Sequence, residues 1–367
     1  MGGMLWVGVA IAAALVLLLV VRAMGGDDEE PAAAPKAEPK GEPREKVATP
    51  IKVLTPPPDA RNSKTGRDEE EPEGTKVASI PPPPEAESHV HPKVHVTEEE
   101  VPLEFGFADE DPTGPQALIL VSGVGRTDPG RRRKHNEDAY LVLDEHAVFA
   151  IADGMGGYAA GEVASQLAVD VMAEAFKTNT FAGTPDPERP HRGDELCQAI
   201  EMANLAILTQ ARANEAQAGM GTTVVSARFS PNKQRVYIAH VGDSRLYRLR
   251  GGEIRQLTTD HTLGAAGITG PSASKLSRAV GIMDLVEVEL TIDAPKVGDY
   301  YLLCSDGLSK MVPDEMIKQI IDENAEINRA CERLVETANE RGGRDNVSVI
   351  LVHVEQPHSS QRPPEVV

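Results

Sequence analysis

A proline-rich, strongly charged stretch at residues 22–115 restricts any globular fold to the part of the chain that follows it. The stretch contains a run of four prolines at 81–84 and acidic blocks at 27–30 and 68–71, with Lys and Arg between them. Such a segment buries too little apolar surface to offset the entropy of ordering its backbone. We therefore predict a disordered linker over 22–115, one folded domain over 116–355 and a short disordered tail over 356–367.

The composition excludes several classes of protein. Lys and Arg number 37 against 57 Asp and Glu, a net charge of −20, which argues against nucleic acid as a partner because phosphate backbones are bound by basic surfaces. The 3 cysteines are widely spaced, which argues against a disulfide framework and a cysteine zinc site. We expect Cys304 and Cys331 to be buried free thiols. The P-loop, zinc-protease and cysteine-phosphatase motifs are also absent from the sequence.

Residues 4–21 form an uncharged apolar run ahead of the linker. At about 1.5 Å per residue a helix of this length spans roughly 27 Å, enough to cross the hydrocarbon core of a bilayer. The alternative is a cleaved signal peptide, but no Lys or Arg precedes the run and no clear small-residue cleavage site follows it directly. We expect a single-pass membrane anchor, with Arg22 favouring a cytoplasmic location for the domain that follows.

The folded part predicts an α+β protein. Apolar, β-branched runs predict strands, several of them joined by short turns that favour antiparallel hairpins, at 117–124, 139–143, 147–152, 222–229, 235–241, 245–249, 286–290, 299–304 and 347–354. Amphipathic patterns predict helices at 161–176, 194–217, 314–323 and 327–341. Strands in blocks with helices in pairs indicate separate α and β layers rather than alternating βαβ units.

The chemistry lies in carboxylates at the ends of predicted strands, most of them beside Gly or Asn: Glu137, Asp138, Asp153, Asp243, Asp306 and Asp345. Clustered carboxylates repel one another unless cations lie among them. Oxygen ligands without Cys or His favour Mg²⁺ or Mn²⁺, and two such ions about 4 Å apart activate water and bind a phosphoryl oxygen in known enzymes. Each Asp-Gly pair alone is more often an ordinary turn, so the prediction depends on the whole set.

In order and spacing, the motifs of this domain resemble the bacterial metal-dependent protein serine/threonine phosphatases of the PPM (type 2C) family. The segments that carry the resemblance are RRRKHNEDAY, ADGMGGYAAGEVAS, MGTTVV, AHVGDSRLY, LTTDHT, LSRAVG, LLCSDGLSKMV and RDNVSVI, which together span most of 117–354. The resemblance implies a central β-sandwich of two antiparallel sheets flanked by antiparallel helix pairs, with metal ions at one end.

The resemblance also implies roles for individual residues. Asp153 would bridge two Mn²⁺ or Mg²⁺ ions, and the Gly154 carbonyl would bind one of them. Asp306 and Asp345 would be ligands of the first ion. Glu137 and Asp138 would hold waters on the ions, and Arg133 would bind the substrate phosphate, for which a guanidinium fork is well suited.

Two features depart from the family pattern. Met155 stands where many members carry a histidine that is proposed to protonate the leaving group, so any general acid must be another group. The flap at 262–276 is short and has no carboxylate, although Asp243, the other ligand of a third-ion site in the family, is present. Any third ion is therefore expected to bind weakly.

The sequence thus predicts a membrane-anchored phosphatase that acts on phosphoserine and phosphothreonine in proteins, the substrates of Ser/Thr kinases. One alternative is an inactive phosphoprotein-binding module, which a missing metal carboxylate would indicate, and another is a scaffold whose function lies in the linker. Arg131 and Arg132 are either plain surface charge or a preference for acidic phosphopeptides. His89, His91 and His95 are most simply scattered residues of a solvated linker.

Overall fold

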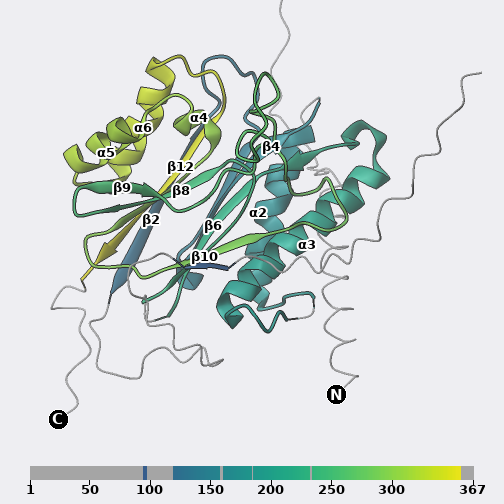
Figure 1. Cartoon of the computed structure of the whole chain (residues 1–367), viewed down its shortest axis with the longest axis horizontal. Coiled ribbons are helices and arrows are strands. Elements are labelled where there is room, and N and C mark those ends of the chain that lie inside the picture. The colour runs from purple at the N-terminus through teal and green to yellow at the C-terminus, as the bar shows by residue number, and fades with distance from the viewer. Residues whose placement is uncertain (1–93, 97–118, 158–159, 184, 232–233, 357–367) are drawn as a thin grey trace, which may run out of the picture. The chain divides into compact units, whose positions relative to one another are not determined.

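Two β-sheets lie face to face, with helices over the outer face of each (Figure 1). The computed structural model describes residues 94–96, 119–157, 160–183, 185–231 and 234–356. The first sheet has seven strands in the order β1-β10-β7-β6-β4-β3, with β5 paired to β4. These strands are β1 (Val94–Val96), β3 (Asp138–Leu143), β4 (Val148–Met155), β5 (Gly221–Thr222), β6 (Val224–Phe229), β7 (Val236–Val241) and β10 (Glu289–Asp293).

The second sheet has five strands in the order β2-β12-β11-β8-β9. These are β2 (Leu120–Asp128), β8 (Arg245–Arg250), β9 (Glu253–Gln256), β11 (Tyr300–Cys304) and β12 (Val347–Glu355). All its pairs are antiparallel. In the first sheet only the pair β1–β10 is parallel, within the part of the chain that the structure describes.

Two pairs of helices form the outer layers. The pair α2 (Ala160–Thr178) and α3 (His191–Ala213) packs on the first sheet, and the pair α5 (Asp314–Glu323) and α6 (Ile327–Glu340) packs on the second. A short helix, α4 (Asp306–Ser309), follows β11, and two 3-10 turns lie at Asp144–His146 (η1) and Glu215–Gln217 (η2).

The alternation of side chains along the strands produces three hydrophobic layers. In β4, Val148 and Ala150 face the helices, whereas Phe149 and Ile151 face the other sheet. The layer between the sheets is closed by T-shaped ring contacts from Phe229 to Phe149 and to Tyr301, with centroids 6.1 and 5.5 Å apart. These contacts favour one register for β4, β6 and β11, because a slip of one residue would turn their side chains to the wrong face.

The structure confirms the predicted two-sheet architecture and all four predicted helices. The strand expected at 286–290 instead spans Glu289–Asp293. One alternating apolar pattern runs through Val286, Val288, Leu290 and Ile292, so the sequence does not mark where the strand begins or ends. Its limits are set by the pairing with β7. Strand β9 and helix α4 were not predicted. Strand β1 lies inside the predicted linker and is the exception to antiparallel pairing.

Several predictions fall on residues outside this description. The anchor at 4–21, nearly all of the linker at 22–115 and the tail from residue 357 are among them. Across the described ranges, no helix combines the length and apolarity that a bilayer span requires. The cysteines at 197, 304 and 331 are all buried and free, as predicted for the last two.

Candidate active site

The predicted carboxylates converge at the end of the sandwich where β4 and β11 finish and β3 and β12 begin. Asp138 is the first residue of β3 and is the register partner of Asp153 in β4. Asp306 follows β11 at the start of α4, and Asp345 lies just before β12. Asp153 lies within electrostatic range of Asp138, Asp306, Asp243 and Asp345. The fold therefore gathers residues that are far apart in the sequence.

The backbone at Asp153 and Gly154 is held tightly. The Asp153 amide donates to Thr223 Oγ1 at 3.2 Å, and the Gly154 amide donates to the Glu137 carbonyl at 3.0 Å. A Cβ atom at position 154 would lie 2.1 Å from the Gly161 carbonyl oxygen, so only glycine fits there. This close approach fixes the Gly154 peptide beside the carboxylates.

The carboxylates strongly influence one another's protonation. Burial, followed by the charge of Asp138 and other neighbouring carboxylates, raises the pKa of Asp153 well above its usual range. Burial raises the pKa of Asp138 to about 7, and burial together with Asp306 raises the pKa of Asp243. A site of this kind favours bound cations, which would compensate the charges.

Two buried oxygen atoms that lack a hydrogen-bond partner indicate whether the cluster suits a metal ion. Asp138 Oδ1 and Asp306 Oδ1 are buried and have no hydrogen-bond partner among the described residues. A buried acceptor without a donor is costly, and hard divalent cations bind carboxylate oxygen. The donor set of the cluster therefore fits Mg²⁺ or Mn²⁺.

Arg133 lies at the mouth of the cluster. Its Nη2 is 2.9 Å from Asp345 Oδ2, and its Nη1 is 3.5 Å from Glu137 Oε2. These carboxylates raise the pKa of Arg133, chiefly through the hydrogen bond to Asp345. Almost half of its side chain is exposed (47%), so the guanidinium remains accessible to a phosphate.

Hydrogen bonds from Asn346 join the loops that present the carboxylates, a role that the sequence reading missed. Its Oδ1 accepts the Glu137 amide at 2.8 Å, and its Nδ2 donates to the carbonyls of Pro129 and His135 at 3.0 and 2.9 Å. Asn346 is buried. The signal available in the sequence was the Asn that directly follows Asp345 in RDNVSV.

Ser305 and Lys310 were also missed. The Ser305 hydroxyl donates to Asp138 Oδ2 at 2.8 Å and accepts the Ser348 amide at 3.0 Å, so it orients Asp138. Lys310 contacts Asp306, four residues earlier, and its Nζ lies 3.5 Å from Asp243 Oδ2. The four-residue spacing from Asp306 was the sequence signal for this ion pair.

The flap at 262–276 is a short loop closed on itself. The Leu263 amide donates to the Lys275 carbonyl at 2.9 Å, and the Gly264 amide donates to the Ala273 carbonyl at 2.7 Å. It brings no carboxylate of its own toward Asp243. Met155, at the position of the histidine in many relatives, ends β4 opposite Gly221 and offers no proton donor.

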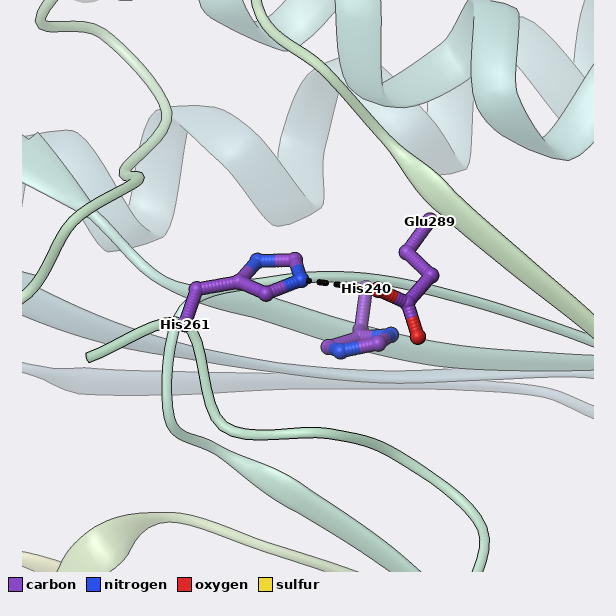
Figure 2. A group of neighbouring side chains, drawn as sticks. All are labelled: His240, His261 and Glu289. Carbon is purple, nitrogen blue, oxygen red and sulfur yellow. Dashed lines mark hydrogen bonds and ion pairs between the residues drawn. The ribbon is translucent and has the colours of Figure 1, made fainter. Parts of the chain in front are cut away.

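A second group of potential ligands lies behind Asp243. Figure 2 shows His240, His261 and Glu289, whose ligand atoms lie within 4.8 Å of one another. The Gly242 amide donates to His261 Nδ1 at 3.2 Å, which assigns the proton of this ring to Nε2, facing Glu289 Oε2 at 3.2 Å. The guanidinium of Arg278 lies 3.3 Å from the same Nε2, where it would repel a metal ion.

These contacts make the histidine cluster a support for the active site. The two imidazole rings stack with centroids 4.5 Å apart, and burial lowers the pKa of His240 to about 4, which keeps it neutral. The His261 amide also donates to the Gly242 carbonyl at 2.9 Å. His261 thus bonds to both polar backbone groups of Gly242 and supports the backbone directly before Asp243.

Known proteins share both the sequence and the fold of this domain. The family model of protein phosphatase 2C matches residues 130–351. The serine/threonine phosphatase stp of Listeria welshimeri is 36% identical over 241 residues, which cover 62% of this chain and 93% of the relative. The serine/threonine protein phosphatase PstP of Mycobacterium tuberculosis is 37% identical over 253 residues, 65% of this chain and 46% of the relative.

Solved structures of protein serine/threonine phosphatases share the fold of this domain. The catalytic domain of PstP in complex with 2 manganese ions is 36% identical, has a TM-score of 0.57 and covers 65% of this chain and 100% of its own. The serine/threonine phosphatase Stp1 of Staphylococcus aureus is 30% identical, has a TM-score of 0.58 and covers 67% of this chain and 99% of its own. The chain belongs to the protein phosphatase 2C family, and it is a bacterial-type protein serine/threonine phosphatase, a hydrolase of phosphoproteins that uses Mn²⁺ or Mg²⁺.

Proposed function

We propose that this phosphatase holds two divalent ions in its carboxylate cluster and that an N-terminal helix anchors it to the membrane. The observation that carries the metal proposal is the pair of buried, unpartnered oxygens Asp138 Oδ1 and Asp306 Oδ1 within one cluster. The PstP catalytic domain, which carries 2 manganese ions, supports the same number here. Asp153 would hold both ions and the Gly154 carbonyl one of them. The remaining residues would be Asp306 and Asp345 as ligands of the first ion, Glu137 and Asp138 as partners of bound waters, and Asp243 as a ligand of any weak third ion.

Each side chain of the site then has a defined task. When bound, the ions supply positive charge that activates water as a nucleophile and offsets the charge of the phosphoryl group. Arg133, exposed at the mouth, binds the phosphate of phosphoserine or phosphothreonine and orients it toward the cluster. Ser305 and Asn346 hold Asp138 and Glu137 in place through the hydrogen bonds described above.

The competing function is a module that binds phosphoproteins without turnover. Loss of a metal carboxylate would favour it, yet all six predicted carboxylates are present in this chain: Glu137, Asp138, Asp153, Asp243, Asp306 and Asp345. The donor set therefore favours catalysis.

The membrane proposal rests on the sequence. Residues 4–21 are uncharged and apolar, and Arg22 is the nearest flanking cation. The domain would then lie on the cytoplasmic side, tethered by the linker at 22–115, where it would oppose ATP-dependent Ser/Thr kinases. A flexible tether of this length has a mean span on the order of 50–60 Å.

Phosphate release from a phosphothreonine peptide tests the proposed function. The purified protein is assayed with Mn²⁺, with Mg²⁺ and with excess EDTA. We expect hydrolysis with either ion and none with EDTA, and restored activity when Mn²⁺ is added back. Saturable binding of the peptide with no phosphate release under any of these conditions would support the competing function instead.

A further inference from the structure

A basic pocket lies directly beside the carboxylate cluster. It has a volume of about 400 Å³ and is lined by Lys310, Met311, Arg341 and Arg344. Lys310 follows α4 and Arg341 follows α6, two helices that contact each other. Three of the four lining residues are cations, in a chain whose net charge is −20.

The two arginines of the pocket are available to a ligand. Both side chains are exposed, and across the described ranges neither forms an ion pair with a carboxylate. The Arg341 Nε donates to the Met311 carbonyl at 2.6 Å, a neutral partner that fixes the side chain without cancelling its charge. By contrast, arginines in the sheets, such as Arg228, Arg245 and Arg250, are paired with carboxylates.

The loop that carries Arg344 is rigidly joined to the loop that carries Arg133. The Gly343 carbonyl accepts the amides of Arg131 and Arg132 at 2.8 and 3.1 Å. Gly343 has φ +48°, and a Cβ there would lie 2.8 Å from the Arg131 amide nitrogen, so the close approach of the loops requires glycine. The pocket and the phosphate-binding arginine therefore keep a fixed relationship to each other.

The pocket is also within reach of a bound substrate. Arg344 precedes Asp345, whose carboxylate contacts Arg133, and Lys310 Nζ lies 3.5 Å from Asp243 Oδ2. An extended peptide advances about 3.3 Å per residue, so side chains a few positions from the phosphorylated residue pass this region.

We propose that the pocket of Lys310, Arg341 and Arg344 binds a second anionic group of the substrate, either an acidic side chain or a further phosphate near the scissile one. This inference rests on the proposed function of the neighbouring site and adds a substrate class to it: acidic or multiply phosphorylated segments of phosphoproteins. Guanidinium groups bind carboxylate and phosphate in the same forked geometry, so both sources satisfy the pocket.

The test compares kcat/KM for matched phosphothreonine peptides on the full-length protein with Mn²⁺. One peptide has neutral flanks, a second set has glutamates within three residues on either side, and a third set has a second phosphothreonine there. We expect the anionic peptides to be favoured about tenfold over the neutral one, and the preference to shrink in high salt. If kcat/KM rises only for the peptides with a second phosphothreonine, the pocket binds phosphate. If kcat/KM also rises for the peptides with glutamates, the pocket binds either anion.

Variants of the pocket test whether it produces the preference for anionic peptides. Arg344→Gln is expected to reduce the preference to about twofold, and Arg344→Lys to retain part of it because the charge remains without the fork. Arg255→Gln removes an exposed arginine from β9, on the second sheet, and serves as the matched control that keeps the wild-type preference. Equal kcat/KM for neutral and anionic peptides would contradict anion binding by the pocket while the phosphatase function stands. So would equal effects of Arg344→Gln and Arg255→Gln on the preference. Failure to hydrolyse any peptide would instead count against the proposed function.

Discussion

Asp138 and Asp153 are register partners on adjacent antiparallel strands, so the pairing of β3 with β4 places two carboxylates side by side at the end of the sandwich. Directly opposed residues in such a pair have Cβ atoms about 5 Å apart, and like charges there oppose folding. In the proposed site, bound cations would offset this repulsion. Burial raises the pKa of both residues, and the charge of Asp138 raises that of Asp153 further.

The first prediction concerns Asp138 and pH. Burial raises its pKa to about 7 in the folded protein, above the value of about 4 for an unfolded chain. The folded state thus holds a proton that the unfolded state loses, and the stability from this group is present below about pH 4 and lost as the pH rises through 7. In EDTA, Asp138→Asn should gain about 2 kcal/mol of stability relative to wild type between pH 5 and pH 8.

Denaturant unfolding of both proteins across this pH range measures the effect. The comparison with wild type cancels the opposite contribution of His240, whose lowered pKa of about 4 favours folding at higher pH. Parallel stability profiles for wild type and Asp138→Asn would show that folding does not raise the pKa of Asp138.

The second prediction separates Arg133 from the metal ligands. If Arg133 binds substrate phosphate, Arg133→Ala should raise KM for a phosphopeptide and lower kcat/KM about ten- to a hundredfold, with Mn²⁺ affinity near normal. Asp306→Ala and Asp345→Ala should instead raise the Mn²⁺ concentration needed for activity.

Isothermal titration of Arg133→Ala with Mn²⁺ provides the decisive readout. Its contact with Asp345 Oδ2 at 2.9 Å allows an alternative role, in which the guanidinium only neutralises the acidic cluster. A change in Mn²⁺ affinity as large as the change in peptide affinity would support that alternative and overturn phosphate binding.

The third prediction concerns Asn346. Asn346→Ala would leave the Glu137 amide and the carbonyls of Pro129 and His135 without their partner. We expect a loss of stability of about 3 kcal/mol and weaker Mn²⁺ binding, since the loops of Glu137 and Asp345 lose their connection. Thermal unfolding with and without Mn²⁺ checks both. An unchanged melting temperature would show that solvent satisfies these groups.

The fourth prediction tests the anchor and its orientation. Protease added to intact cells should leave the phosphatase domain undigested, and the domain should sediment with membranes until detergent is added. N-terminal sequencing should find that residues 4–21 are retained. Digestion of the domain in intact cells, or a mature protein that begins after residue 22, would contradict this arrangement.

Much of the fold and site could be predicted because the local sequence patterns agreed with the arrangement of the whole fold. In β4, the continuous apolar run at 148–152 predicted the strand, and the Asp153–Gly154 pair at its end supplied the candidate ligands, since strand ends in a sandwich converge. The contacts of Asn346 with Glu137 and of Lys310 with Asp243 could not be predicted, because they depend on which loops meet in space. The limits of β10 were missed for a similar reason: its alternation continues beyond the segment that pairs with β7.

In the proposed site Asp153 holds both metal ions, so the hydrolysis of phosphoproteins depends on its carboxylate. The most direct measurement is phosphate release by Asp153→Asn and wild type at saturating Mn²⁺, with Mn²⁺ stoichiometry determined on the same samples. We predict that wild type binds two tightly held ions and is active, whereas Asp153→Asn keeps its fold, loses tight Mn²⁺ binding and has no measurable activity. An Asp153→Asn protein that retains more than about a tenth of the wild-type kcat, equivalent to about 1.4 kcal/mol or less of barrier, would contradict the account.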